Sequence, residues 1–208
     1  QAKTNAAVRY HAADMTRPVE IADLIAYAHK EFGRLDILVN NAGIQHVEAV
    51  ETYPEEKWDA LIAVILSSTF HASKAAIPIM KAQGRGRIVN IASAHGLVAS
   101  AFKAPYVAAK FGVVGFTKAC AVELARTGIT VNAICPGYVK TPLIEAQVVD
   151  QAKTRGIPED RVITDVILAA QPNKTFVEYS HLAGMLLYLV SDMGASATGA
   201  ALSVDGGW

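Results

Sequence analysis

A tyrosine and a lysine four residues apart are the side chains of this sequence whose types and spacing best suggest chemistry. Tyr106 and Lys110 lie in an apolar stretch with helical periodicity. This spacing places both side chains on one face of a helix, about one turn apart. Because a positive charge favours the phenolate, we expect Lys110 to lower the pKa of Tyr106 below its reference value of about 10. The pair therefore predicts a general base that works near neutral pH.

A serine at the end of a predicted strand offers a third reactive group. Ser93 closes the apolar stretch 87–93, and Asn40 and Asn41 close another. Open α/β sheets bind their ligands at the carboxyl ends of their strands, where the Ser93 hydroxyl could orient a substrate oxygen toward the phenol. A tyrosine and lysine at this spacing usually decorate a helix surface. Together with these strand ends, they favour a catalytic interpretation.

The elements that must position these groups follow from the hydrophobic pattern. Apolar runs of strand length alternate with longer stretches of helical period, which predicts βαβ units in a doubly wound parallel sheet, a Rossmann-type three-layer α/β fold. Thr16 and Gly33 are expected to cap and end the first helix. Residues 138–175 have weak periodicity and suit a mobile lid. The expected strands are 8–12, 35–40, 87–93, 130–134 and 201–204, and the other helices are 54–82, 106–127 and 177–190.

Composition limits the kinds of partner. The 208 residues are 52% hydrophobic and 18% charged, with a net charge of zero, which predicts one compact domain over residues 1–208 and argues against nucleic-acid binding. Charged residues, Gly or Pro interrupt the apolar runs before the ~20 residues of a membrane span. Cys120 and Cys135 form no disulfide framework and no metal motif. We therefore expect a cytoplasmic protein without a metal, membrane or nucleic-acid partner.

These motifs together resemble the short-chain dehydrogenase/reductase family. The matching blocks span almost the whole chain: 40–46, 91–100, 106–110, 112–118, 134–137 and 204–208. Ile44-Gln45-His46 and the block 93–100 are similar to the members that oxidise 3-hydroxybutyrate. The resemblance implies NAD-dependent oxidation of (R)-3-hydroxybutyrate to acetoacetate by a homotetramer. Tyr106 would take the hydroxyl proton, Ser93 would bond the substrate oxygen, and Lys110 would also hold the nicotinamide ribose.

The resemblance also implies the binding residues. NAD would contact Asp14, Met15, Asn41, Ala42, Gly43, Tyr106, Lys110, Pro136, Gly137, Val139 and Thr141. The hydroxy acid would contact Gln45, Ser93, His95, Lys103, Tyr106, Tyr138 and Gln147. Lys103 alone could be a solvated loop lysine and His95 a loop histidine bonded to backbone, but with Gln45 and Gln147 they favour a carboxylate site. The segment Leu202–Trp208 is expected to form a subunit contact.

Two departures from the family pattern bear on activity. No glycine-rich turn precedes Asp14, so we expect an amino-terminally incomplete domain that lacks the first βαβ strands and exposes the edge strand 35–40. Ile65 stands where the family has an asparagine that supports a helix kink and a proton relay, so turnover should be reduced. Tyr138 replaces the tryptophan that is usual in the 3-hydroxybutyrate-oxidising members.

Two other functions remain open from the sequence. One is a reductase of the same family acting on another carbonyl, such as a 3-oxoacyl thioester or a sugar, for which a buried Lys103 would give no advantage. The other is a non-catalytic scaffold, which would not bind NADH. The choice between NAD and NADP also stays open, because the residue that reads the ribose 2′ position follows the missing second strand.

Overall fold

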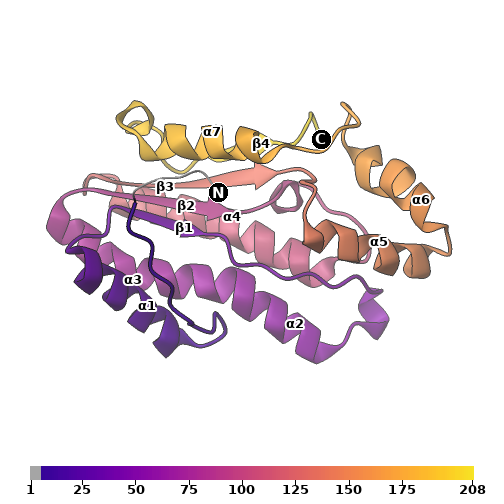
Figure 1. Cartoon of the computed structure of the whole chain (residues 1–208), viewed down its shortest axis with the longest axis horizontal. Helices are drawn as coiled ribbons and strands as arrows, with labels where there is room; N and C mark the ends of the chain where they lie inside the picture. Colours follow the sequence, from indigo (N-terminus) through magenta and orange to yellow (C-terminus); the bar gives the residue numbers. More distant parts are fainter. Residues whose placement is uncertain (1–5) are drawn as a thin grey trace.

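A parallel four-stranded sheet organises the molecule. The computed structural model describes residues 6–208, apart from the side chains of Leu143 and Ala146. Its strands lie in the order β1 (Ile37–Asn40), β2 (Gly86–Ile91), β3 (Ile129–Pro136) and β4 (Ala201–Val204), as Figure 1 shows. All neighbouring pairs are parallel, so the carboxyl ends of the strands meet at one edge. The predicted doubly wound α/β fold is confirmed.

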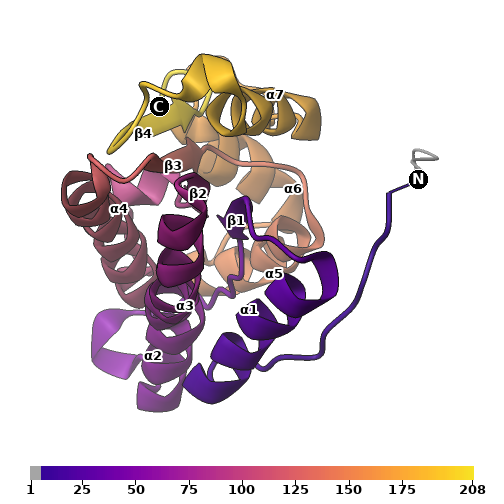
Figure 2. The ribbon, with the colours of Figure 1, turned by 90° about the vertical axis from the view of Figure 1, so that its left-hand side faces the viewer.

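Helices cover both faces of the sheet. One face carries α1 (Pro18–Phe32), α2 (Glu55–Leu61), α3 (Ser68–Gln83) and α4 (Ala104–Leu124), and the other carries α7 (Tyr179–Val190), as Figures 1 and 2 show. Successive residues of β2 serve opposite faces, as expected for a strand. Ile88 packs in a cluster with α1 and α3, while Val89 packs in a cluster with Leu189 of α7.

A further group of helices lies beyond the carboxyl ends of the strands. It comprises α5 (Pro142–Arg155), α6 (Glu159–Val162), the π-helical turn η4 (Ile163–Ile167) and the 3₁₀ turn η5 (Leu168–Ala170). Short 3₁₀ turns also occur at η1 (Val50–Thr52), η3 (Ala94–Gly96) and η6 (Asp192–Gly194). Tyr138, Val162 and Ile167 form the centre of a separate apolar cluster in this region. The predicted lid segment 138–175 is therefore mostly helical.

The predicted strand 8–12 is wrong. These residues have no regular secondary structure, and Val8 is 81% exposed. A strand needs a hydrogen-bonding neighbour, and within residues 6–208 none lies beside this segment. Thr16 is not the helix cap either, because α1 begins after Arg17 and the Thr16 hydroxyl donates to Asp14 Oδ1.

The outer edge of β1 is exposed, as predicted. Ile37 and Val39 are 44% and 39% exposed, whereas every residue of β3 is buried. Within the described residues β1 pairs only with β2. The strand has the nearly continuous apolar character of one covered on both faces, but only part of that surface is buried.

A π-helical turn, η2 (Ile62–Ser67), interrupts the long helix between α2 and α3. Ile65 lies in this turn and is 1% exposed, so the local distortion is present without a hydrogen-bonding side chain there. The Ser68 and Thr69 hydroxyls donate to the carbonyls of Val64 and Ile65. By length and composition alone the helical stretch 55–83 could cross a membrane, with a mean hydropathy of 1.5. Its packing in two core clusters makes it a core helix of this domain.

A buried polar network ties the strand ends to the helices beneath them. Asn40 Nδ2 donates to Asn90 Oδ1 at 2.8 Å, and Asn90 Nδ2 donates to Thr117 Oγ1 at 2.9 Å. The Thr117 hydroxyl in turn donates to the carbonyl of Val113. Asn90 is fully buried, so each of these bonds satisfies a group that water cannot reach. The network fixes β1, β2 and α4 relative to one another.

Replacing Thr117 with valine tests this network. T117V keeps the shape of the side chain but removes the acceptor for the buried Asn90 amide, so the free energy of unfolding should fall by about 1–3 kcal/mol. Urea denaturation measures the change. The matched control T52V alters an exposed threonine and should change stability by less than about 0.5 kcal/mol. Equal effects of the two substitutions would contradict the role of the network.

Candidate active site

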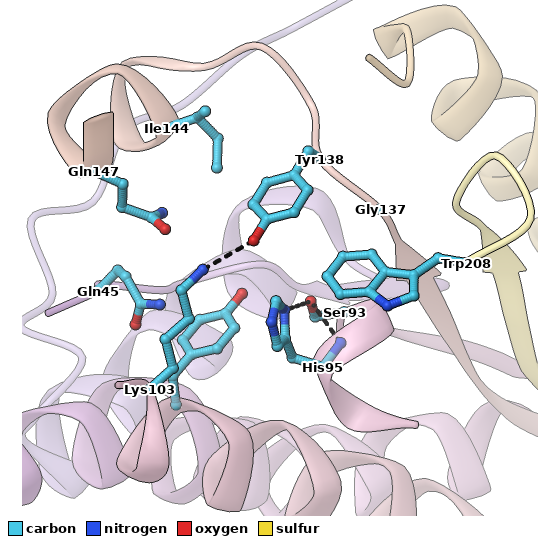
Figure 3. Close-up of a pocket in the computed structure, with 10 residues that line it drawn as sticks. Gln45, Ser93, His95, Lys103, Gly137, Tyr138, Ile144, Gln147 and Trp208 are labelled. Carbon is cyan, nitrogen blue, oxygen red and sulfur yellow. Dashed lines mark hydrogen bonds between the residues drawn. The ribbon is translucent and has the colours of Figure 1, made fainter. Parts of the chain in front are cut away.

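A small cavity lies at the carboxyl edge of the sheet. It encloses about 50 Å³. Figure 3 shows its side chains converging from β-strand ends, α4, α5 and the carboxyl terminus. The lining residues are Gln45, Ser93, His95, Lys103, Tyr106, Gly137, Tyr138, Ile144, Gln147 and Trp208. All seven residues predicted to contact the hydroxy acid therefore line one cavity.

Ser93 and His95 are held by the turn that follows β2. Ser93 caps the 3₁₀ turn η3, where its Oγ accepts the backbone N–H of His95 at 3.1 Å. His95 Nδ1 lies 3.5 Å from the same oxygen (Figure 3). Its Nε2 lies 2.7 Å from Ser100 Oγ. Burial, and secondarily the charge of Lys103, lowers the pKa of His95 to about 3. His95 is thus neutral and fixed against Ser93.

Tyr106 and Lys110 lie on one face of α4, as the spacing predicts. The Lys110 ammonium lies 5.6 Å from the centre of the Tyr106 ring and donates to the Ile91 carbonyl at 2.6 Å. The predicted lowering of the Tyr106 pKa by Lys110 is wrong for this structure. Burial raises the pKa of Tyr106, and the interaction that opposes this shift is the hydrogen bond with Ser93. Burial also lowers the pKa of Lys110 to about 8.

Lys103 is a buried cation. It is 2% exposed, and its Nζ donates to Tyr138 Oη at 3.1 Å (Figure 3). Burial, with a smaller contribution from Arg155, lowers its pKa to about 8. Lys103 follows Phe102, whose φ of 66° is unusual for a residue other than glycine, and it caps α4. The turn before α4 therefore directs the ammonium inward, and the alternative of a solvated loop lysine does not hold.

The position of Tyr138 depends on a buried glutamine that the sequence did not single out. Gln171 is fully buried; its Oε1 accepts the backbone N–H of Tyr138, and its Nε2 donates to the Thr175 carbonyl.

The backbone of Gly137 passes very close to Asp205. A Cβ at position 137 would lie 2.9 Å from the Asp205 Cα. A glycine is therefore required at the start of this segment.

A second cavity of about 490 Å³ opens beside the first. The two share Ser93, Tyr106, Gly137 and Ile144, so they are contiguous. Eight residues predicted to contact the cofactor line it: Asn41, Gly43, Tyr106, Lys110, Pro136, Gly137, Val139 and Thr141. We call this second cavity the groove.

Three residues predicted to contact the cofactor are not among those lining the groove. Asp14 is exposed and bonds Thr16, and Met15 packs against the cluster beneath α1. Ala42 lies between two lining residues but does not line the groove itself. The structure thus gathers most, but not all, of the predicted cofactor residues.

Trp208 and Ile144 are cavity residues that sequence reasoning missed. The Trp208 ring stacks on Tyr138 at 5.3 Å and meets the His95 ring edge-on at 4.8 Å. The Trp208 side chain forms a wall of the cavity (Figure 3), and the subunit contact expected for the segment Leu202–Trp208 stays a prediction. The one sequence feature that could have indicated this role is the position of Trp208, a large aromatic residue shortly after the predicted strand 201–204.

Comparisons with known proteins identify the family. A family model described as short chain dehydrogenase matches residues 1–152. D-beta-hydroxybutyrate dehydrogenase of Rhizobium meliloti (strain 1021) is 58% identical over 201 residues, which cover 97% of this chain and 78% of the relative. The chain belongs to the short-chain dehydrogenase family.

Other members of the short-chain dehydrogenase family agree in sequence and fold. The D-beta-hydroxybutyrate dehydrogenase of Cupriavidus necator is 50% identical over 208 residues, 100% of this chain and 81% of that protein. The crystal structure of a variant actinorhodin polyketide ketoreductase with NADPH matches with a TM-score of 0.88 and 39% identity. That match covers 93% of this chain and 75% of the ketoreductase. The resemblance deduced from the motifs is confirmed.

The pKa of Lys103 is directly measurable. Burial should place its midpoint near 8, so the ammonium is charged below that pH and neutral above it. NMR titration of lysine side chains in the whole chain, with the Lys103 signal assigned by its loss in K103M, gives the midpoint. A midpoint near the reference value of about 10.4 would show that this ammonium is solvated.

Proposed function

We propose that this chain oxidises (R)-3-hydroxybutyrate to acetoacetate with NAD as the hydride acceptor. The observation that carries the proposal is the buried ammonium of Lys103 in the same small cavity as Ser93 and Tyr106. A cation there suits a substrate that carries a carboxylate close to its reacting hydroxyl. The two D-beta-hydroxybutyrate dehydrogenases at 58% and 50% identity support the same substrate.

The substrate carboxylate would bind between Lys103, Gln45 and Gln147. Lys103 forms no ion pair with a carboxylate within the described residues, so an anion would supply its missing counter-charge. Gln45 Nε2 is a buried donor without a protein partner in the described structure. A carboxylate oxygen would satisfy both groups, which explains why two such costly features occur together.

The segment 138–175 would serve as a lid over this cavity. The cavity of about 50 Å³ is small, which suits a small acid. Ile144 and Gln147 of α5 form its outer wall together with Tyr138. We therefore assign these side chains the role of closing the lid over the bound substrate.

Ser93 and Tyr106 would perform the proton chemistry. The substrate hydroxyl would donate to Oη of Tyr106 in its phenolate form, which takes up the proton and becomes the neutral phenol as the C–H bond loses its hydride. Ser93 Oγ would bond the same substrate oxygen, and neutral His95 would keep that hydroxyl in place. Because both contiguous cavities include Ser93 and Tyr106, the reacting carbon would face the groove.

The groove fits a nicotinamide dinucleotide in its position and lining. It lies at the carboxyl ends of the strands, where such sheets bind their ligands, and Gly43 leaves its floor uncrowded. Asn41, Lys110, Val139 and Thr141 would hold the cofactor, which supplies the hydride acceptor when bound. NAD is proposed from the resemblance, and the solved ketoreductase with NADPH makes a comparison of both cofactors necessary.

Exposed apolar side chains on α3 and α4 would form the subunit contacts of a cytoplasmic homotetramer. Phe70 of α3 is 43% exposed, and Phe111 and Val122 of α4 are 44% and 79% exposed.

The side chain of Ile65 should limit the rate of turnover. Isoleucine cannot pass a proton, so release of the proton from Lys110 to solvent should be slow. The reaction itself would remain, because Ser93, Tyr106 and Lys110 are all present.

Assay of the two enantiomers tests the proposal. Formation of reduced nicotinamide, followed by absorbance, should occur with (R)-3-hydroxybutyrate and NAD, and far more slowly with the (S) enantiomer or with NADP. A 3-oxoacyl thioester supplied with NADPH tests the rival reductase. Turnover of the thioester alone would overturn the proposed substrate, and failure to bind NADH would favour the scaffold.

Removing the phenol hydroxyl should abolish most of the activity. Y106F keeps the ring but removes the group that accepts the proton, so kcat should fall by about 10²–10⁴-fold. Y10F is the matched control, because Tyr10 is 87% exposed and should leave kcat unchanged. Retention of activity by Y106F would exclude Tyr106 as the base.

Binding of the hydroxy acid should weaken with rising pH. Its carboxylate pairs with protonated Lys103, whose pKa is about 8, so above this value KM should rise by up to about tenfold for each pH unit. K103M should raise KM at neutral pH and remove this pH dependence. K81M, on the exposed side of α3, should behave like the unchanged protein. A pH profile that survives in K103M would assign it to another group.

A further inference from the structure

Three guanidinium groups gather at the opposite end of the sheet, where the strands begin. They line an open pocket of about 220 Å³. Figure 1 shows that α5 and α6 lie beyond the other end of the sheet. The pocket residues are Arg34, Asp36, Ile37, Arg85, Arg87 and Val190. We call this the arginine pocket, and neither the proposed reaction nor the groove uses it.

The charges of the arginine pocket do not balance. Arg34 donates to both oxygens of Asp36 at 2.5 and 2.6 Å, and Arg85 pairs with Asp192 at 2.8 Å. Both of these arginines are largely exposed. Arg87 forms no ion pair with any carboxylate of the described residues. The three arginines thus have two carboxylate partners between them, and the arginine without an ion pair is the buried Arg87.

Arg87 has a donor with no acceptor. The residue is only 5% exposed, and its Nη1 donates to the carbonyls of Gly86 and Gly128 at 2.9 and 3.2 Å. Its Nε is buried and has no hydrogen-bond partner in the described structure. Burial and the nearby charge of Arg85 lower the pKa of Arg87, and the charge of Asp192 opposes this shift without forming an ion pair with Arg87. A buried cation with an unsatisfied donor is costly unless an anion compensates it.

We propose that the arginine pocket binds a phosphate group, either as inorganic phosphate or as the phosphate of a small monoester. Arg87 would supply the unmatched positive charge and the hydrogen bond from its Nε, and Arg34 and Arg85 would add guanidinium donors from the rim. The planar guanidinium fork matches the spacing of phosphate oxygens, and charge-assisted bonds of this kind are the strong ones. Because Arg34 already neutralises Asp36 through two bonds, that carboxylate opposes the anion only weakly.

Bound phosphate would connect β1, β2 and the turn that follows α7. Arg87 is the second residue of β2 and pairs in register with Ile37 of β1. Arg85 reaches Asp192, in the turn that follows α7. A ligand that bonds these arginines would bind the folded state preferentially, so it would also raise the melting temperature.

Titration calorimetry on the whole chain tests the site, with inorganic phosphate and glycerol phosphate as probes at ionic strength held constant with chloride. We expect one site for at least one probe. R34Q and R85Q should each weaken binding by about tenfold, the loss of one charge-assisted interaction. R161Q removes an exposed arginine that pairs with Asp165 on α6 and should leave the affinity unchanged.

R87Q should abolish binding while the protein stays folded by circular dichroism. If R87Q does not fold, the double variant R34Q/R85Q decides, because both of its arginines are exposed, and its binding should be lost. Binding of glycerol phosphate alone identifies a monoester as the ligand, and equal binding of both probes identifies the free phosphate group as sufficient. Tighter binding of acetate than of phosphate, no binding of either probe, or equal affinity in all variants would overturn the proposal.

Discussion

The Lys110 ammonium bonds the carbonyl of Ile91, and this contact joins α4 to the end of the central strand. Parallel pairing of β2 with β3 places Ile91, the last residue of β2, beside Ile134, so Ser93 and Gly137 both follow at the same edge of the sheet. Tyr106 stands one helical turn before Lys110 and therefore faces Ser93. A second set of contacts between β2 and α4 comes from the hydrogen bonds of Asn40, Asn90 and Thr117. The cavity follows from where these strands end.

Desolvation, more than charge pairing, sets the acid–base properties of the cavity. It raises the pKa of Tyr106 and lowers those of Lys103 and Lys110 to about 8 and that of His95 to about 3. The charge of Lys110 near Tyr106 was predictable from the sequence, but the burial of the phenol was not. In the structure the Lys110 ammonium is bonded to a backbone carbonyl, and the hydrogen bond with Ser93 favours the phenolate instead. The Ser93 hydroxyl therefore matters to the phenol as well as to the substrate.

Periodic, buried elements were predictable from the sequence, and tertiary contacts were not. The strand 201–204 has the predicted bounds, and the long helices are displaced by only a few residues, because their apolar patterns are strong. The predicted strand 8–12 failed because strand formation depends on a neighbour that a local pattern cannot reveal. The substrate residues could be named from a resemblance to a family. Trp208 and Gln171 could not, since their contacts with His95 and Tyr138 join segments far apart in the chain.

The two ends of the sheet share one physical feature, a buried cation without a carboxylate partner in the described part of the chain. Lys103 occupies this position at the carboxyl edge and Arg87 at the amino edge. Each has a nearby buried donor that the protein leaves unsatisfied, Gln45 Nε2 in one case and Arg87 Nε in the other. Apolar side chains of similar volume at such positions would make the fold more stable. The cations are therefore best explained by anionic ligands whose binding offsets the free-energy cost of burying a charge. Lys103, a compact point charge, suits the carboxylate of a small acid, whereas the forked guanidinium of Arg87 suits the several oxygens of a phosphate.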